Sequence, residues 1–141
     1  MRTRGLLPLI VSVSACGGVP QPDLVASDVV VTRPMPGMAM SAAYLTLHNN
    51  SDRIISITRV TSTEYSLVQM HQTTVEDGIA RMRPLPQLDI PAGGDIRLER
   101  GGKHLMLMRP MGSTDGVSLQ FYDGETPLLT VDSGYAAAQS R

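Results

Sequence analysis

Short alternating segments, each ended by turn residues, constrain this chain more than any other feature of its sequence. Val117, Leu119 and Phe121 alternate with polar residues, and Leu45 and Leu47 do the same in an earlier segment. An alternation of period two places one set of side chains on one face of a strand. Glycine, proline, asparagine and aspartate separate the segments, and no stretch of useful length has a helical period. The sequence therefore predicts one all-β domain, an antiparallel sandwich or barrel.

The expected strands are rich in β-branched and aliphatic residues. They cover residues 29–32, 43–49, 54–61, 66–75, 79–83, 88–90, 96–98, 104–109, 117–122 and 128–131. Among the turns between them, Asp77-Gly78 has the strongest signal, because this dipeptide favours a two-residue hairpin loop. Such a loop pairs Glu76 with Ile79 and Thr73 with Met82.

This register predicts which side chains share a face. His71 lies two residues from Thr73, so His71 and Met82 become diagonal neighbours, roughly 7–8 Å apart at the backbone. Met70 faces the opposite side, beside Leu85, and is expected in the core. A three-residue turn would reverse this parity. How the hairpin pairs with the strand of His104 does not follow from the sequence.

The N-terminus has the pattern of a secretory signal. Arg2 and Arg4 precede an apolar run of about ten residues, too short to span a bilayer as a helix. Val13-Ser14-Ala15-Cys16 resembles a bacterial lipobox, in which the signal is cut before a cysteine that then carries lipid. The alternative is an ordinary signal with Cys16 near the cut by chance. Acyl chains on Cys16 would hold the protein on a membrane surface.

These features predict the organisation of the chain. Residues 1–15 are the expected lipoprotein signal peptide, residues 16–27 a lipidated tether rich in glycine and proline, residues 28–133 the domain and residues 134–141 a short tail. The predicted location is the bacterial cell envelope, facing the periplasm. The absence of an obvious retention signal after Cys16 gives a slight preference for the outer membrane.

Composition excludes several classes of protein. Removal of the signal leaves ten basic and thirteen acidic residues, and no basic patch of the kind that nucleic-acid binding requires. The single cysteine rules out a disulfide within the chain. No Gly-x-Ser-x-Gly elbow and no paired histidine-glutamate metal helix is present, so an enzyme is not expected.

Two histidines and two methionines form the candidate site. They follow the pattern His-x10-Met-x21-His-x-Met, with His71, Met82, His104 and Met106. His104, Met106 and Met108 share one face of a strand, since they recur at period two. The partly polar character of that face suits the exposed edge of a site.

The types of residue in this pattern favour a soft monovalent metal. Imidazole and thioether groups suit Cu(I). Zinc would prefer cysteine, histidine and carboxylate, and calcium would need a cluster of oxygen ligands. A blue-copper electron-transfer site needs a cysteine thiolate, which this domain lacks. Each histidine or methionine taken alone is more often structural, so the prediction depends on all four positions matching together. His48 fits no such spacing and is expected to be structural.

The spacing and its surroundings resemble the periplasmic CuA-site copper chaperones, the PCuAC family. The segments that carry the likeness are residues 42–49, 77–83, 90–94 and, most distinctive, Gly101-Gly102-Lys103-His104-Leu105-Met106-Leu107-Met108. The likeness extends over roughly residues 29–131. It implies a cupredoxin-like Greek-key β-sandwich with one Cu(I) near its surface, held by His71, Met82, His104 and Met106.

The resemblance also implies a function. It predicts an extracytoplasmic metallochaperone that delivers copper to the CuA-bearing subunit of cytochrome oxidase, alongside a Sco-type copper protein. This chain differs from many members in its lipobox, and from others in lacking a tail rich in histidine and methionine for a second copper. A copper-buffering or copper-resistance lipoprotein would use the same ligands without a dedicated acceptor. A metal-free interaction module, with methionine used only for packing, is the remaining alternative.

Three further methionines, Met35, Met38 and Met40, lie in a loop-like segment with proline and glycine. They could contribute an auxiliary Cu(I) contact or an apolar surface for a partner. Ordinary packing against the sandwich is the favoured interpretation, because methionine adapts well to irregular gaps.

Overall fold

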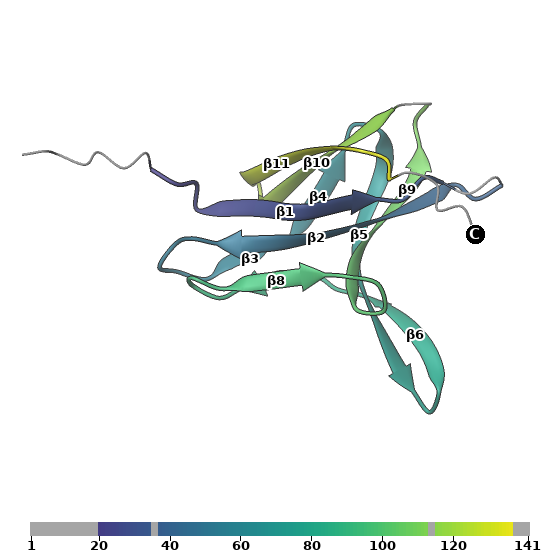
Figure 1. The fold of residues 1–141 in the computed structure, drawn as a ribbon, viewed down its shortest axis with the longest axis horizontal. Helices are drawn as coiled ribbons and strands as arrows, with labels where there is room; N and C mark the ends of the chain where they lie inside the picture. The colour runs from purple at the N-terminus through teal and green to yellow at the C-terminus, as the bar shows by residue number, and fades with distance from the viewer. Residues whose placement is uncertain (1–19, 35–36, 113–114, 137–141) are drawn as a thin grey trace, which may run out of the picture.

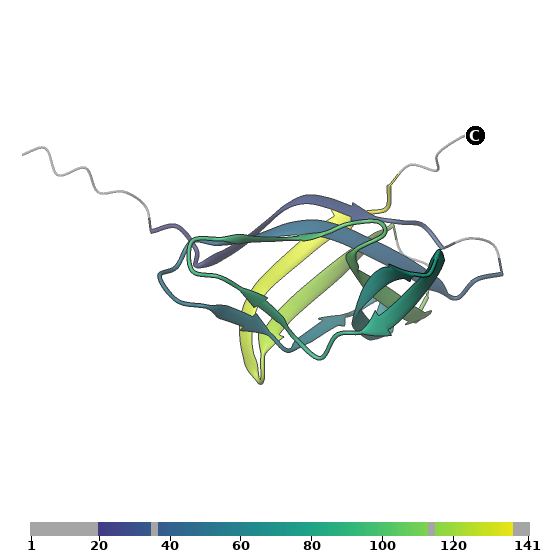
Figure 2. The same ribbon diagram turned by 90° about the horizontal axis from the view of Figure 1, so that it is seen from below.

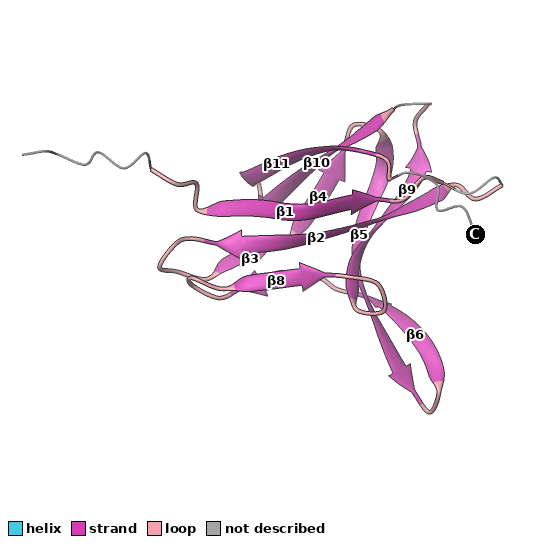
Figure 3. Ribbon diagram, viewed as in Figure 1, coloured by secondary structure: helices cyan, strands magenta, loops and turns pink. Residues whose placement is uncertain are grey.

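Residues 20–34, 37–112 and 115–136 are described by the computed structural model, and the signal segment, Cys16 and Met35 lie outside these ranges. Every regular element within them is a strand (Figure 3). The strands are β1 (Leu24–Val31), β2 (Met40–Asn49), β3 (Ile55–Ile57), β4 (Arg59–Ser62), β5 (Tyr65–Glu76), β6 (Ile79–Pro84), β7 (Leu88–Ile90), β8 (Asp95–Leu98), β9 (Lys103–Pro110), β10 (Gly116–Asp123) and β11 (Thr126–Gly134). The predicted all-β fold is confirmed.

Two main sheets make up the sandwich (Figures 1 and 2). The larger has the order β1-β2-β9-β5-β6, and β8 pairs with the second half of β2. The smaller has the order β11-β10-β4, and β3 pairs with β7. All pairings between these strands are antiparallel. Because β9 lies between β2 and β5, the segment with His104 is placed in the middle of the larger sheet.

Aliphatic side chains from both sheets fill the core. Leu45, Leu47, Leu105 and Leu107 point inward from the larger sheet, and Phe121 faces them from the smaller, each at most 1% exposed. Burial of such side chains contributes about 1.5–3 kcal/mol each relative to exposure. The sandwich is thus held by ordinary apolar packing from alternate positions, which leaves the other positions of the larger sheet for the outer face.

One buried hydrogen-bond chain ties the C-terminal strand region to the larger sheet. The Tyr65 hydroxyl lies 2.8 Å from Ser41 Oγ and 2.9 Å from the Tyr135 hydroxyl. Burial raises the pKa of Tyr65 to about 12, so the phenol stays neutral and able to donate at neutral pH. Tyr135 also bridges to Val31 through the backbone.

The structure corrects two details of the expected strands. The single strand expected over residues 54–61 divides at Thr58 into β3 and β4, which belong to different sheets. The alternation shifts there, so Val60 is buried and Arg59 is exposed, with its guanidinium 4.1 Å from the centre of the Tyr122 ring. In addition, β1 begins at Leu24 and β11 runs from Thr126 to Gly134, so both strands are longer than the expected segments 29–32 and 128–131.

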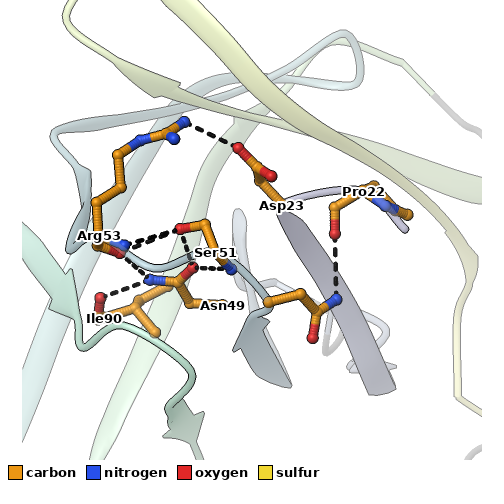
Figure 4. Close-up of polar contacts among 7 residues, drawn as sticks. Pro22, Asp23, Asn49, Ser51, Arg53 and Ile90 are labelled. Atoms are coloured by element: carbon orange, nitrogen blue, oxygen red, sulfur yellow. Dashed lines mark hydrogen bonds and ion pairs between the residues drawn. The ribbon is translucent and has the colours of Figure 1, made fainter. Parts of the chain in front are cut away.

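Asn49 organises the turn that follows β2 (Figure 4). Its buried side-chain nitrogen donates to the carbonyl oxygens of Arg53 at 2.7 Å and of Ile90 and Pro91 at 3.0 Å. Its side-chain oxygen accepts from the backbone nitrogen of Ser51 at 2.9 Å and from Ser51 Oγ at 2.6 Å. One side chain therefore joins β2, the turn and the end of β7.

No helix among the described residues is long and apolar enough to cross a membrane.

Replacing Asn49 by alanine should lower the free energy of unfolding by about 1–3 kcal/mol, because buried carbonyl oxygens lose their donor. Urea denaturation followed by far-UV circular dichroism measures the change. Asn50→Ala is the matched control, since Asn50 is exposed and its side chain makes one hydrogen bond, to the carbonyl oxygen of Pro22. Equal stability of the two variants would contradict the role of Asn49.

Candidate functional site

The hairpin of β5 and β6 has the predicted register. Glu76 pairs with Ile79 and Thr73 pairs with Met82, as expected from the Asp77-Gly78 loop. Asp77 and Gly78 have φ values of 52° and 76°, the positive angles that a type I′ turn needs and that this dipeptide tolerates. Met70 is 6% exposed and belongs to the core, also as predicted. His71 and Met82 therefore lie on the same face as diagonal neighbours.

The alternation predicted for β9 is confirmed as well. Leu105 and Leu107 are fully buried in the core, and His104, Met106 and Met108 take the positions between them. The expectation of an exposed edge is wrong for His104, which is only 5% exposed. Its neighbours explain this, because the ring centres of Tyr44 and His71 lie 6.4 Å and 6.0 Å from that of His104.

Pairing of β5 with β9 brings the two candidate histidines together. His71 is directly opposite His104, and the two rings are stacked with an angle of 20° between their planes. The next bond along the ladder, from the nitrogen of Thr73 to the carbonyl oxygen of Gly102 at 3.0 Å, fixes this register. Residues 33 positions apart in the sequence thus form one cross-strand imidazole pair.

The outer face of β2, β9 and β5 has three rows of opposed residues. His104 and His71 form the first row, with the Tyr44 ring beside His104. Ala42, Met106 and Gln69 form the second row, and Met40, Met108 and Leu67 the third. Successive rows are about 7 Å apart along the strands. Met106 therefore lies one row from the imidazole pair, beside a small alanine.

Hydrogen bonding prepares the imidazoles for a metal. His104 Nδ1 lies 3.1 Å from the carbonyl oxygen of Gly102, which can only accept, so Nδ1 carries the proton and Nε2 has the lone pair. A backbone carbonyl on the far nitrogen is how proteins commonly orient a ligating histidine. His71 Nδ1 is buried and has no hydrogen-bond partner among the described residues. Leaving a buried polar nitrogen without a partner costs free energy, and a bound metal ion would provide that partner.

Met82 is the outlying member of the candidate set. Its side chain is 52% exposed, and the hairpin that carries it projects from the body of the sandwich (Figure 1). Glu76 pairs with Arg81 and Arg83 at 3.2 Å. By the hairpin register these charged side chains lie on the face opposite Met82. Apart from His71, the Met82 face of the hairpin thus has apolar and hydroxyl side chains.

The third histidine has a different environment. His48 Nε2 lies 2.8 Å from Ser27 Oγ and its Nδ1 lies 2.7 Å from Asp95 Oδ1, so both nitrogens are occupied. These contacts join β1, β2 and β8, in agreement with the structural role expected for His48. In the part of the chain that the structure describes, no three side chains of histidine, cysteine, aspartate or glutamate gather in an arrangement that could hold a metal.

Sequence reasoning missed Tyr44 and Arg100. The Tyr44 ring shields His104 on the side of β2, and the Arg100 guanidinium lies 5.3 Å from the centre of that ring. Tyr44 is an aromatic residue at an outward position of an alternating strand, which was a usable signal. Arg100 belongs to the turn before β9. Its contact with Tyr44 on β2 depends on the order of the strands in the sheet, which does not follow from the sequence.

The geometry defines a class: a small cupredoxin-like β-sandwich with an imidazole pair and a neighbouring thioether on the outer face of its larger sheet. The family model described as "Putative lipoprotein LpqE-like" matches residues 24–127. The chain therefore belongs to the LpqE-like lipoprotein family.

Individual relatives agree with this assignment. A curated protein of Leifsonia xyli subsp. xyli, "Putative lipoprotein Lxx21020", is 33% identical over 101 residues, which cover 67% of this chain. Those residues cover 61% of the relative, so this chain matches about three fifths of its length.

Solved structures share the fold. The copper-bound PCuAC domain from PmoF2 superposes with a TM-score of 0.67 at 15% identity, covering 85% of this chain and 97% of that domain. The solution structure of CuI-DR1885 from Deinococcus radiodurans gives a TM-score of 0.61 at 27% identity, covering 86% and 82%. The likeness to the PmoF2 domain concerns the fold alone.

His104 should occupy the tautomer with the proton on Nδ1, because the Gly102 carbonyl accepts from that nitrogen. Long-range ¹H–¹⁵N correlation spectra of the metal-free protein at neutral pH distinguish the two nitrogens. His71 is the internal comparison, since its Nδ1 has no such partner among the described residues. A proton on Nε2 of His104 would contradict the proposed orientation.

Proposed function

We propose that this protein is an extracytoplasmic copper chaperone that binds one Cu(I) through His71, Met82, His104 and Met106. The observation that carries the proposal is the direct opposition of His71 and His104, with Met106 one row away on the same face. The nitrogen ligands are His104 Nε2, through its lone pair, and His71 Nδ1, which has no hydrogen-bond partner among the described residues. The thioether of Met106 supplies the soft donor that Cu(I) prefers over harder metals.

Met82 completes the set when the hairpin bends toward the imidazoles. All six residues of β6 are exposed, so few packing contacts oppose this motion. A ligand on a projecting hairpin can detach first, which would open the metal to an acceptor by ligand exchange. Cu(I) then moves without any change of oxidation state, and no chemistry on a substrate is required. Copper is the cargo of such a protein.

The relatives support copper as the metal. One solved neighbour is described as a copper-bound PCuAC domain and another as CuI-DR1885. We extend this to the delivery of copper to the CuA-bearing subunit of cytochrome oxidase, with a Sco-type copper protein as a further partner. Lipid on Cys16 would keep the domain at the periplasmic side of the cell envelope. The family description as a lipoprotein supports that anchor.

Removal of any one ligand should weaken Cu(I) binding by about tenfold or more, since a loss of about 1.4 kcal/mol is already a tenfold change. The variants are His71→Ala, His104→Ala, Met82→Leu and Met106→Leu, where leucine removes the sulfur at similar volume. Anaerobic titration of the purified protein against a competing Cu(I) chelator measures the affinity.

Two variants serve as matched controls for this titration. Met70→Leu removes a thioether that is adjacent to His71 in sequence but lies in the core. His48→Ala removes the histidine that pairs with Ser27 and Asp95. Both should bind Cu(I) as the wild type does. Binding that is insensitive to all four ligand changes would leave the metal-free interaction module as the better description.

Delivery can be separated from buffering by the acceptor. The Cu(I)-loaded protein should transfer its metal to the CuA domain of an oxidase faster than to a small chelator of equal Cu(I) affinity, because a dedicated acceptor engages the exposed hairpin. After transfer, a mild one-electron oxidant converts the copper-loaded CuA domain to its coloured mixed-valence state, and the absorption of that state measures the copper delivered. The apo-CuA domain mixed with the Cu(I)–chelator complex is the control. Equal rates to both acceptors would favour a copper-buffering lipoprotein.

A further inference from the structure

The methionines of this domain are mostly not used for packing. Among the described residues only Met70 is a buried methionine, whereas Met38, Met40 and Met111 are 45%, 39% and 59% exposed. Met38 and Met40, for which packing against the sandwich was the favoured expectation, thus remain more than a third exposed. An exposed thioether gains little from burial, so chemistry is a better reason for its presence than core filling.

The exposed Met40 forms a cross-strand pair with a half-buried methionine, Met108. Met40 on β2 is directly opposite Met108 on β9, one row beyond Met106. The backbone nitrogen of Arg109 donates to the carbonyl oxygen of Ala39 at 3.2 Å. Ala39 and Arg109 are therefore the hydrogen-bonded pair, next to Met40 and Met108 along the strands. Met40 and Met108 consequently occupy a non-hydrogen-bonded position, where Cα atoms are about 4.5 Å apart and side chains are closest.

The pair is also connected to the proposed copper site. Ala42 lies between Met40 and Tyr44 along β2 and is opposite Met106, so only a methyl group stands beside Met106 on this strand. Met108 and Met106 are two residues apart on one face, about 7 Å at the backbone, and both have three rotatable side-chain bonds. Their sulfur atoms can therefore approach each other over the space above Ala42.

The chemistry of the pair is selective. Two thioethers carry no charge and offer soft sulfur donors, which suit Cu(I) but not hard divalent cations. The third member of the row is Leu67, which is apolar and contributes no competing ligand. Without imidazole or thiolate, such a pair should hold Cu(I) less tightly than the site with two histidines.

We propose that Met40 and Met108 form a second, weaker Cu(I) site through which copper enters the His71 and His104 site. This proposal rests on the proposed function. Copper bound by the two thioethers exchanges a sulfur of the pair for the sulfur of Met106, so that one copper–sulfur bond forms as another breaks. The imidazoles then complete the tighter site. The metal stays Cu(I) throughout, and no proton is transferred between protein groups.

The test is an anaerobic Cu(I) titration of the purified protein carrying Met40→Leu and Met108→Leu together. The wild type should bind one tight and one weaker equivalent, and the double variant should lose the weaker equivalent and keep the tight one. Loading from a Cu(I)-chelator complex, followed by stopped-flow absorption, should also be slower in the double variant. Met70→Leu is the control and should retain both equivalents and the wild-type rate.

The outcomes separate the two proposals. A single equivalent in the wild type, or a double variant that keeps both equivalents and loads at the wild-type rate, would overturn the entry site. The parallel titration of a variant carrying His71→Ala and His104→Ala together addresses the main site, because without either imidazole it should lose the tight equivalent and keep the weaker one. X-ray absorption of that variant should show copper with sulfur ligands only, and nitrogen ligands there would also overturn the assignment. Thermal unfolding by circular dichroism shows that each variant is folded.

Discussion

The candidate site depends on one cross-strand contact, the pairing of His71 on β5 with His104 on β9. Two strands distant in sequence must align in a single register for this contact to form. A shift of one residue would turn one imidazole into the core and bring a leucine or a methionine outward. The buried Leu105 and Leu107 prevent such a shift, since exposing them would cost several kcal/mol of apolar burial. Core packing therefore specifies the site as well as the fold.

The candidate site combines a buried part and an exposed part. His104 belongs to the central strand of the larger sheet, is 5% exposed, and has its orientation set by the Gly102 carbonyl. Met82 is on a hairpin whose second strand is exposed along its whole length. The proposed chaperone must bind its metal and release it, and a packed imidazole pair with an exposed thioether suits both tasks. A fully enclosed site would hold copper well but would hinder transfer.

The methionines also divide between the core and the outer face of the larger sheet. Met70 has the role usual for this residue, filling space in the core, and it lies next to His71 in sequence without sharing its face. The outward methionines of β2 and β9 lie along one stripe that leads to the imidazole pair. Thioethers resist the oxidation that would convert exposed thiols to disulfides outside the cytoplasm. A path of methionine side chains is thus compatible with an oxidising compartment in which Cu(I) must remain accessible.

The sequence by itself determined whatever depends on local geometry. Period-two alternation predicted the strands and the inward direction of Leu105 and Leu107, and the Asp77-Gly78 turn predicted the register that places His71 and Met82 on one face. It failed at Thr58, because a change of sheet leaves no local signal beyond a shift in alternation. Only the tertiary structure decided that β9 lies between β2 and β5. This order depends on the packing of strands far apart in the chain. It set His104 opposite His71, covered His104 with Tyr44, and brought Met40 beside Met108.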